Sequence, residues 1–209
     1  WVDWNWNGIL DDKPVRADIT WGIGMDLGPR FNTSGRTVDI NGVFDDYTAF
    51  APELIVHNND LYYFVVKRLS IDSSDSYPTS GTLVMSRYRG NHSFDEAKVV
   101  DTTVTSDPSA VSNGKIIYIF YLTPAGVMYR FGQPDNLSKP ILIPRSADFY
   151  VRAFVWKNKV YVVLYSGAGN NIQYCSVEQD NIGPFQDLGI KSTIPPGIAI
   201  DIIHNQLLL

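Results

Sequence analysis

The sequence predicts an all-β fold, a β-propeller of which this chain holds about three and a half blades. One strand–turn–strand unit recurs along the chain. Aromatic residues make up 13% of the sequence, as suits pleated strands. The 16 glycines and 12 prolines are scattered, as turns between many short strands require. A β-sandwich is the alternative arrangement of such strands.

The repeated unit has an apolar entry, a short turn and a β-branched, aromatic run. The four copies occupy 52–66, 108–121, 152–165 and 197–209, with turns aligned at Asn59, Gly114, Asn158 and Asn205. The spacing is typical of propeller blades, which run to about 40–50 residues each. Because a single blade cannot bury both faces of its sheet, the units are expected to stack around an axis.

Each unit is expected to supply four antiparallel strands. The turn joins the first two strands as a hairpin, and Asn113-Gly114 is the strongest such signal. Second strands are predicted over 61–66, 116–122 and 160–165. Third strands are predicted over 81–88, 126–131 and 171–176. The fourth strands carry the weakest pattern, around 98–100, 141–143 and 186–188.

Two regions follow from this division. Residues 1–50 are predicted to form a calcium-binding loop segment packed on the propeller, and residues 51–209 its blades. The repeat breaks off within a blade at Leu209. We therefore expect the remaining blades to come from further residues of the same protein or from another chain.

Charge is concentrated in the first region. The whole chain has a net charge of −5. Residues 1–50 carry eight of the acids, all of them aspartate, against four lysines and arginines. No basic stripe is present, which argues against a nucleic-acid partner. No apolar run approaches the length of a membrane span. Short acidic side chains gathered in one region indicate a bound cation.

The first acidic cluster has the spacing of a calcium loop. Oxygen side chains stand at loop positions 1, 3, 5 and 9, glycine at position 6, and a backbone carbonyl at position 7. These residues are Asp3, Asn5, Asn7, Asp11, Gly8 and Ile9. The EF-hand's closing glutamate is replaced by Pro14. Since Ca²⁺ takes six to eight oxygens, another carboxylate must close the site, and Asp12 and Asp18 are nearest.

A second, partial pattern lies further along. Asp39, Asn41 and Asp45 repeat the alternate spacing, with glycine after the asparagine. They complete the first site or hold an ion of their own. The alternative is that Asn-Gly at 7–8 and at 41–42 are ordinary hairpin turns with acids beside them.

These motifs carry a resemblance. Residues 3–11, 15–19 and 39–47 resemble a segment of secreted bacterial proteins that binds calcium, often beside protease or propeller domains. Tyr47 stands where that segment usually has tryptophan, and Thr20 where it has asparagine. The repeated units separately resemble sialidase-like and lectin-like propeller blades. The resemblance implies a secreted or cell-surface protein.

Catalytic motifs are missing from the sequence. It has no Asp box of the sialidase type, no His-Glu-x-x-His and no Gly-x-Ser-x-Gly. His57 and His204 precede predicted hairpins and are expected to be solvated turn residues. Cys175 lies in a strand-like alternation and is expected to be an inert buried thiol.

The sequence therefore favours a non-catalytic, calcium-stabilised extracellular propeller. Its expected role is to bind a glycan or a protein, or to serve as an assembly subunit. The alternative is part of a secreted hydrolase, a sialidase-like glycosidase or a peptidase-associated propeller, with catalytic residues elsewhere. Acids and arginine gathered near the propeller axis would favour the hydrolase, and one aromatic pocket per blade would favour binding.

Overall fold

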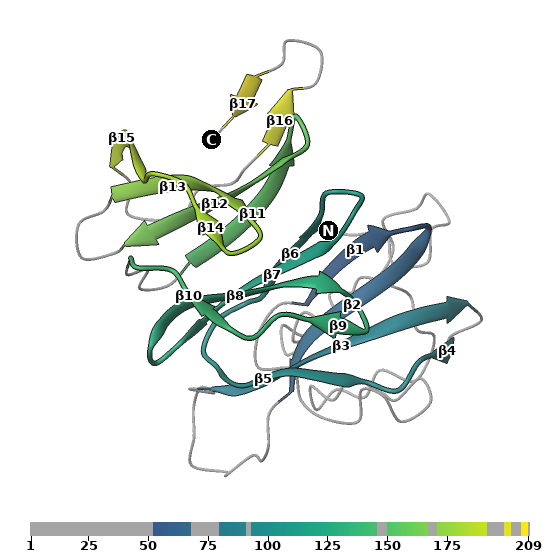
Figure 1. Cartoon of the computed structure of the whole chain (residues 1–209). Helices are drawn as coiled ribbons and strands as arrows, with labels where there is room; N and C mark the ends of the chain where they lie inside the picture. The colour runs from purple at the N-terminus through teal and green to yellow at the C-terminus, as the bar shows by residue number, and fades with distance from the viewer. Residues whose placement is uncertain are drawn as a thin grey trace, which may run out of the picture.

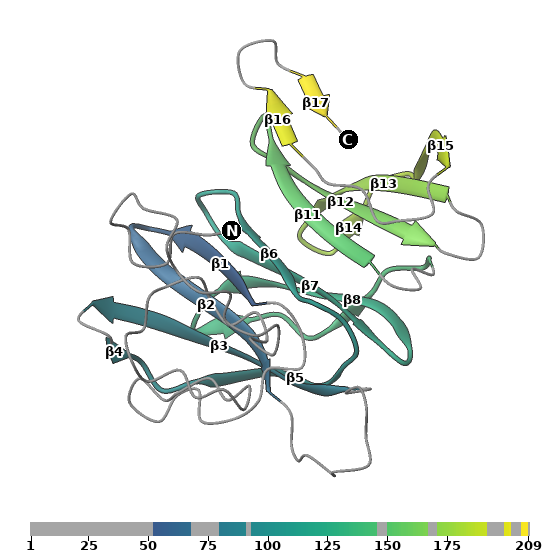
Figure 2. The same ribbon diagram turned by 180° about the vertical axis from the view of Figure 1, so that it is seen from behind.

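The computed structural model describes residues 52–67, 80–90, 93–145, 150–166, 171–191, 199–201 and 206–208. These residues form three successive antiparallel sheets and a final two-stranded hairpin. Figure 1 shows the three sheets following one another along the chain, and Figure 2 shows them from behind. The predicted all-β class is confirmed.

Each sheet repeats one strand order. The first sheet contains β1 (Glu53–His57), β2 (Asp60–Lys67), β3 (Gly81–Gly90) and β5 (Lys98–Val104), with β4 (Ser93–Phe94) on β3. The second contains β6 (Ser109–Ser112), β7 (Ile117–Thr123), β8 (Gly126–Gln133) and β10 (Ile141–Leu142), with β9 (Asn136–Leu137) on β8. The third contains β11 (Tyr150–Trp156), β12 (Lys159–Ser166), β13 (Asn171–Glu178) and β15 (Gln186–Lys191), with β14 (Asn181–Ile182) on β13. The hairpin of β16 (Ala199–Asp201) and β17 (Gln206–Leu208) follows.

The predicted second strands coincide with β2, β7 and β12, which hold the same place in their sheets. The predicted third and fourth strands are also present, as β3, β8 and β13 and as β5, β10 and β15. The short strands β4, β9 and β14 were not predicted. Each has only two residues, which is too short to show an alternating pattern.

Two of the hairpins use two-residue turns with positive φ at both positions. Asn58 and Asn59 have φ of 51° and 65°, and Lys157 and Asn158 have φ of 49° and 62°. This left-handed backbone matches the right-handed twist of the flanking strands, and asparagine tolerates it better than most residues. The turns therefore set the strand register of the first and third sheets.

The hairpin predicted at Asn113-Gly114 is present between β6 and β7, and its turn is longer than the two-residue turns of the other two sheets. The connection spans 113–116, since Ser112 pairs with Ile117. The Asn113 side-chain oxygen accepts hydrogen bonds from the amides of Lys115 and Ile116, each at 3.0 Å. This asparagine closes a wider loop, and Gly114 adopts the positive φ of 84° within it.

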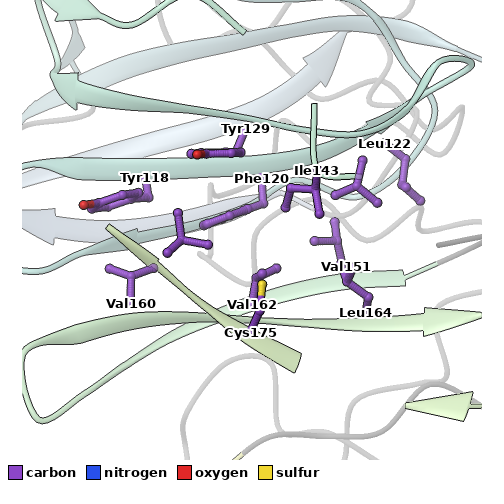
Figure 3. Packing of buried hydrophobic residues seen from close by; sticks show 12 residues of the cluster. Tyr118, Phe120, Leu122, Tyr129, Ile143, Val151, Val160, Val162, Leu164 and Cys175 are labelled. Atoms are coloured by element: carbon purple, nitrogen blue, oxygen red, sulfur yellow. The ribbon is translucent and has the colours of Figure 1, made fainter. Parts of the chain in front are cut away.

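Strand β7 buries both of its faces. Ile117, Ile119 and Tyr121 pack toward the first sheet, in a cluster with Phe64 and Leu83. The alternate side chains belong to a second cluster shared with the third sheet; they are Tyr118, Phe120 and Leu122. Figure 3 shows this second cluster between the two sheets. The middle sheet is thus covered on both sides, and β7 is buried from Ile117 to Leu122.

This stacking distinguishes the fold from a two-layer sandwich, in which each sheet covers only one face of the other. The middle sheet lies between its two neighbours, and its first strand β6 contacts both β1 and β11. Successive sheets that stack face to face with their first strands side by side form a propeller-like arrangement. We refer to the three sheets as blades 1, 2 and 3.

We predict that Phe120→Ala destabilises the chain by about 3–5 kcal/mol, because it leaves a cavity between blades 2 and 3. Phe120 is fully buried. The matched control is Val99→Ala on β5, where the side chain is 59% exposed; it should change stability by less than about 0.5 kcal/mol. Urea unfolding measures both. A loss below about 1 kcal/mol for Phe120→Ala would show that the blades do not depend on this packing.

Candidate functional site

The first strands of the three blades begin near one another. Beside the contacts of β6 with β1 and β11, the amide of Ala153 in β11 donates to Oγ of Ser109 in β6 at 3.0 Å. Ser109 is the first residue of β6. The beginnings of these strands are therefore held together across blades, at the position that the axis of a propeller occupies.

Three charged side chains gather at these strand beginnings. Arg152 of β11 lies with one guanidinium nitrogen 3.7 Å from Oδ2 of Asp107 and another 4.0 Å from Oε2 of Glu53. The same guanidinium donates to the carbonyl of Pro108 at 3.3 Å. Each blade contributes one of the three, because Glu53 opens β1 and Asp107 precedes β6. We call Glu53, Asp107 and Arg152 the axial mouth.

The axial mouth is half-buried. The side chains are 30%, 39% and 29% exposed for Glu53, Asp107 and Arg152. Burial raises the pKa of Glu53 above its ordinary value of 4.5, and this effect exceeds the lowering by Arg152. The neighbouring charge of Asp107 raises the pKa of Glu53 further. Glu53 is thus more inclined to keep its proton than an ordinary glutamate.

This arrangement offers both donors and acceptors to a ligand. The guanidinium supplies fixed N–H donors in a plane, and the two carboxylates supply acceptor oxygens on either side of it. A site that offers both donors and acceptors suits the hydroxyl groups of a ligand, because a hydroxyl can donate one hydrogen bond and accept another. A protonated Glu53 would also serve as a hydrogen-bond donor or a general acid.

The opposite ends of the first strands carry a different contact. His57, the last residue of β1, has Nδ1 2.8 Å from Oγ of Ser112, the last residue of β6. Nε2 of His57 lies 3.1 Å from the Asn58 side-chain nitrogen. Only 2% of His57 is exposed. The prediction of a solvated turn histidine is wrong here, because the stacking of blade 2 on blade 1 covers the end of β1. His57 links two blades.

Cys175 is buried in the cluster between blades 2 and 3, as predicted. Burial raises the pKa of its thiol to about 11. Little thiolate is therefore present near neutral pH, and the thiolate is the reactive form of cysteine. This accords with an inert core residue.

The predicted calcium ligands lie outside the residues that the structure describes. They are Asp3, Asn5, Asn7, Ile9, Asp11, Asp12, Asp18, Asp39, Asn41 and Asp45. His204 also lies outside them. In the part of the chain that is described, no three His, Cys, Asp or Glu side chains gather as a metal site. Nor do these residues include a helix long and apolar enough to cross a membrane.

The axial mouth was not singled out from the sequence, although a signal for part of it was present. Glu53 and Arg152 each lie four residues before the last residue of a first strand, which is His57 in β1 and Trp156 in β11. They thus occupy the same place in the repeat. Two charged residues at one repeat position, in otherwise apolar strands, would have indicated a shared site.

No protein-family model matches the chain, and no curated protein matches it. Among solved structures the chain is similar to Zg3597, a family 117 glycoside hydrolase produced by the marine bacterium Zobellia galactanivorans. The TM-score is 0.46 and the identity 14%, over 73% of this chain. The similarity spans 58% of the length of that structure.

We predict that Glu53 makes stability depend on pH. Because the pKa of Glu53 is higher in the folded chain than its ordinary 4.5, the folded chain binds more protons in the window just above pH 4.5. The contribution of Glu53 to the free energy of unfolding is therefore lost as the pH rises through that window. Glu53→Gln, which mimics the protonated form, should raise the melting temperature at pH 8 and leave it nearly unchanged at pH 4.

The matched control is Glu178→Gln at the exposed end of β13. It should produce no such difference between the two pH values. Differential scanning calorimetry of the three proteins gives the comparison. If Glu53→Gln lowers the melting temperature at pH 8, the ionised form is the one that the fold favours, and the assignment is wrong.

Proposed function

We propose that this chain is part of a calcium-stabilised, non-catalytic extracellular propeller that binds a glycan at the axial mouth. The observation that carries the proposal is the convergence of Glu53, Asp107 and Arg152 from three blades. Such side chains bind sugar hydroxyls through paired donors and acceptors. The half-buried setting strengthens these hydrogen bonds compared with a fully solvated surface.

A second function is favoured by one observation. The raised pKa of Glu53 suits a general acid, as glycoside hydrolysis requires. Acidic side chains and an arginine near the propeller axis are also the features that we expect of a hydrolase from the sequence. Hydrolysis further needs a second carboxylate across the scissile bond. Within the described residues, Glu53 and Asp107 both face the one guanidinium of Arg152, an arrangement that serves binding without further groups.

The calcium site belongs to the same proposal. Support for it comes from the oxygen spacing in residues 3–11, with Asp12 and Asp18 near the loop and the second pattern at 39–45. A bound ion would offset the mutual repulsion of these aspartates. It would then brace the acidic segment, and its carboxylates would be occupied as ligands.

We predict that Arg152→Gln weakens glycan binding at least about tenfold, because it removes the positive charge that attracts both carboxylates and the N–H donors that the charge strengthens. Lys139→Gln, in an exposed loop, is the matched control and should bind as the parent does. A glycan array identifies the ligand, and isothermal titration calorimetry measures its affinity. Equal affinities for Arg152→Gln and the parent would contradict binding at the axial mouth.

The same preparation separates binding from hydrolysis. Incubation of the identified glycan with the parent chain should return it intact by mass spectrometry. Cleavage that disappears in Glu53→Gln and survives in Lys139→Gln would establish the hydrolase instead.

We predict that removing calcium destabilises the chain. EGTA should lower the melting temperature, and added Ca²⁺ should restore it, since an ion that binds only the folded chain stabilises it by mass action. Asp3→Asn with Asp11→Asn should abolish the response. A melting temperature unaffected by EGTA, in a sample that contains no calcium by elemental analysis, would contradict the site.

A further inference from the structure

A cavity of about 90 Å³ lies between blades 1 and 2, away from the axial mouth. Blade 1 contributes walls from β2, β3 and the residues leading into β5, and blade 2 contributes the turn between β8 and β9. Figure 1 shows β9 and its turn beside β3. Tyr62 and Met85 form part of the inner wall, and Pro134 and Asp135 form the turn.

At the corresponding place between blades 2 and 3, described side chains reach across the junction. There the turn between β13 and β14 is bound by two tyrosines of blade 2. The amide of Gln179 donates to the Tyr118 hydroxyl at 3.1 Å, and the Tyr129 hydroxyl donates to the Gln179 carbonyl at 2.9 Å. Tyr118 and Tyr129 are fully buried. Their rings and hydroxyls fill the space between the blades.

The strand register shows that the two junctions are equivalent. Tyr62 in β2 and Tyr118 in β7 occupy the same place in their blades. Each pairs with a residue of the third strand whose backbone carbonyl accepts a hydrogen bond from the segment that follows that strand. Met85 and Tyr129 each lie two residues before that third-strand residue. Met85 therefore stands in blade 1 where Tyr129 stands in blade 2.

The turns are equivalent in the same way. Pro134 is the first turn residue after β8, and Gln179 is the first turn residue after β13. Proline has no amide hydrogen, so Pro134 cannot make the bond that Gln179 makes to a tyrosine. A methionine likewise has no hydroxyl to reach the turn. The junction between blades 1 and 2 thus differs from the next one at two equivalent positions. These two differences leave a cavity where tyrosine and the turn meet in the other junction.

The walls of this cavity are charged, yet their charges are matched. Each of three cations has a carboxylate partner: Arg87 pairs with Asp60 at 2.7 Å, Arg89 with Asp95 at 2.6 Å, and Lys98 with Asp135. A ligand with a fixed charge of either sign would meet repulsion from half of these groups. Ion-paired side chains still keep spare N–H groups and lone pairs, which hydroxyls can use. Nε of Arg87 is buried and has no hydrogen-bond partner.

We propose that this inter-blade cavity binds a neutral, hydroxyl-rich ligand the size of one sugar ring. The cavity is far smaller than the roughly 300–1,000 Å³ of drug-sized ligand sites, so it suits a single ring. The ligand occupies the space that the Tyr129 ring fills in the next junction. This site is separate from the axial mouth and does not depend on it.

The test uses the full chain with methyl α-D-glucopyranoside, methyl β-D-galactopyranoside and myo-inositol as probes. Ligand-observed NMR titration should show that at least one binds, with a Kd of about 1 mM or tighter. Met85→Tyr fills the cavity as Tyr129 does next door and should weaken binding more than about tenfold. Val99→Tyr, on the exposed face of β5, adds the same ring elsewhere and should bind as the parent does.

A second variant covers the case in which Met85→Tyr does not fold. Glu96 lines the cavity and is exposed, so Glu96→Ala should leave the melting temperature unchanged and weaken binding several-fold. Binding by none of the three probes, or binding unchanged in both variants, would overturn the proposal. Binding that is lost in Arg152→Gln but kept in Met85→Tyr would place the sugar at the axial mouth and would also overturn it.

Discussion

The structure depends on the burial of both faces of β7. Its alternate side chains belong to two separate cores, one shared with blade 1 and one shared with blade 3. A strand that is apolar on both sides cannot lie on a surface, because each exposed face would lose the free energy of burial. Blade 2 is therefore stable only between two neighbours. The stacking of successive blades follows from this one strand.

Stacking in turn brings the beginnings of the first strands together. Glu53, Asp107 and Arg152 are far apart in the sequence and come from three blades. Their proximity is a property of the stack. At the other ends of the same strands, His57 and Ser112 form a polar contact between blades, and the histidine in it is buried. The two ends of the axis therefore differ: one holds half-exposed charges, and the other holds a buried histidine.

Repetition also makes differences between blades informative. Equivalent positions are expected to hold similar residues wherever they only pack one blade on the next. Tyr129 and Gln179 perform that packing between blades 2 and 3. Met85 and Pro134 do not perform it between blades 1 and 2, and a charged cavity lies there instead. A residue that departs from the repeat at a junction between blades thus marks a place where the blades leave room for a ligand.

The sequence alone determined the four main strands of each sheet, their order and their period, because alternation, β-branched residues and turn asparagines act over a few residues. It also revealed the core thiol of Cys175. It did not determine the length of the turn at Asn113, which depends on a side chain that folds back on the loop. Nor did it determine the burial of His57, the axial mouth or the inter-blade cavity. Those features exist only between blades, where contacts depend on how whole sheets stack, and no local pattern in one strand records what the neighbouring sheet will place against it.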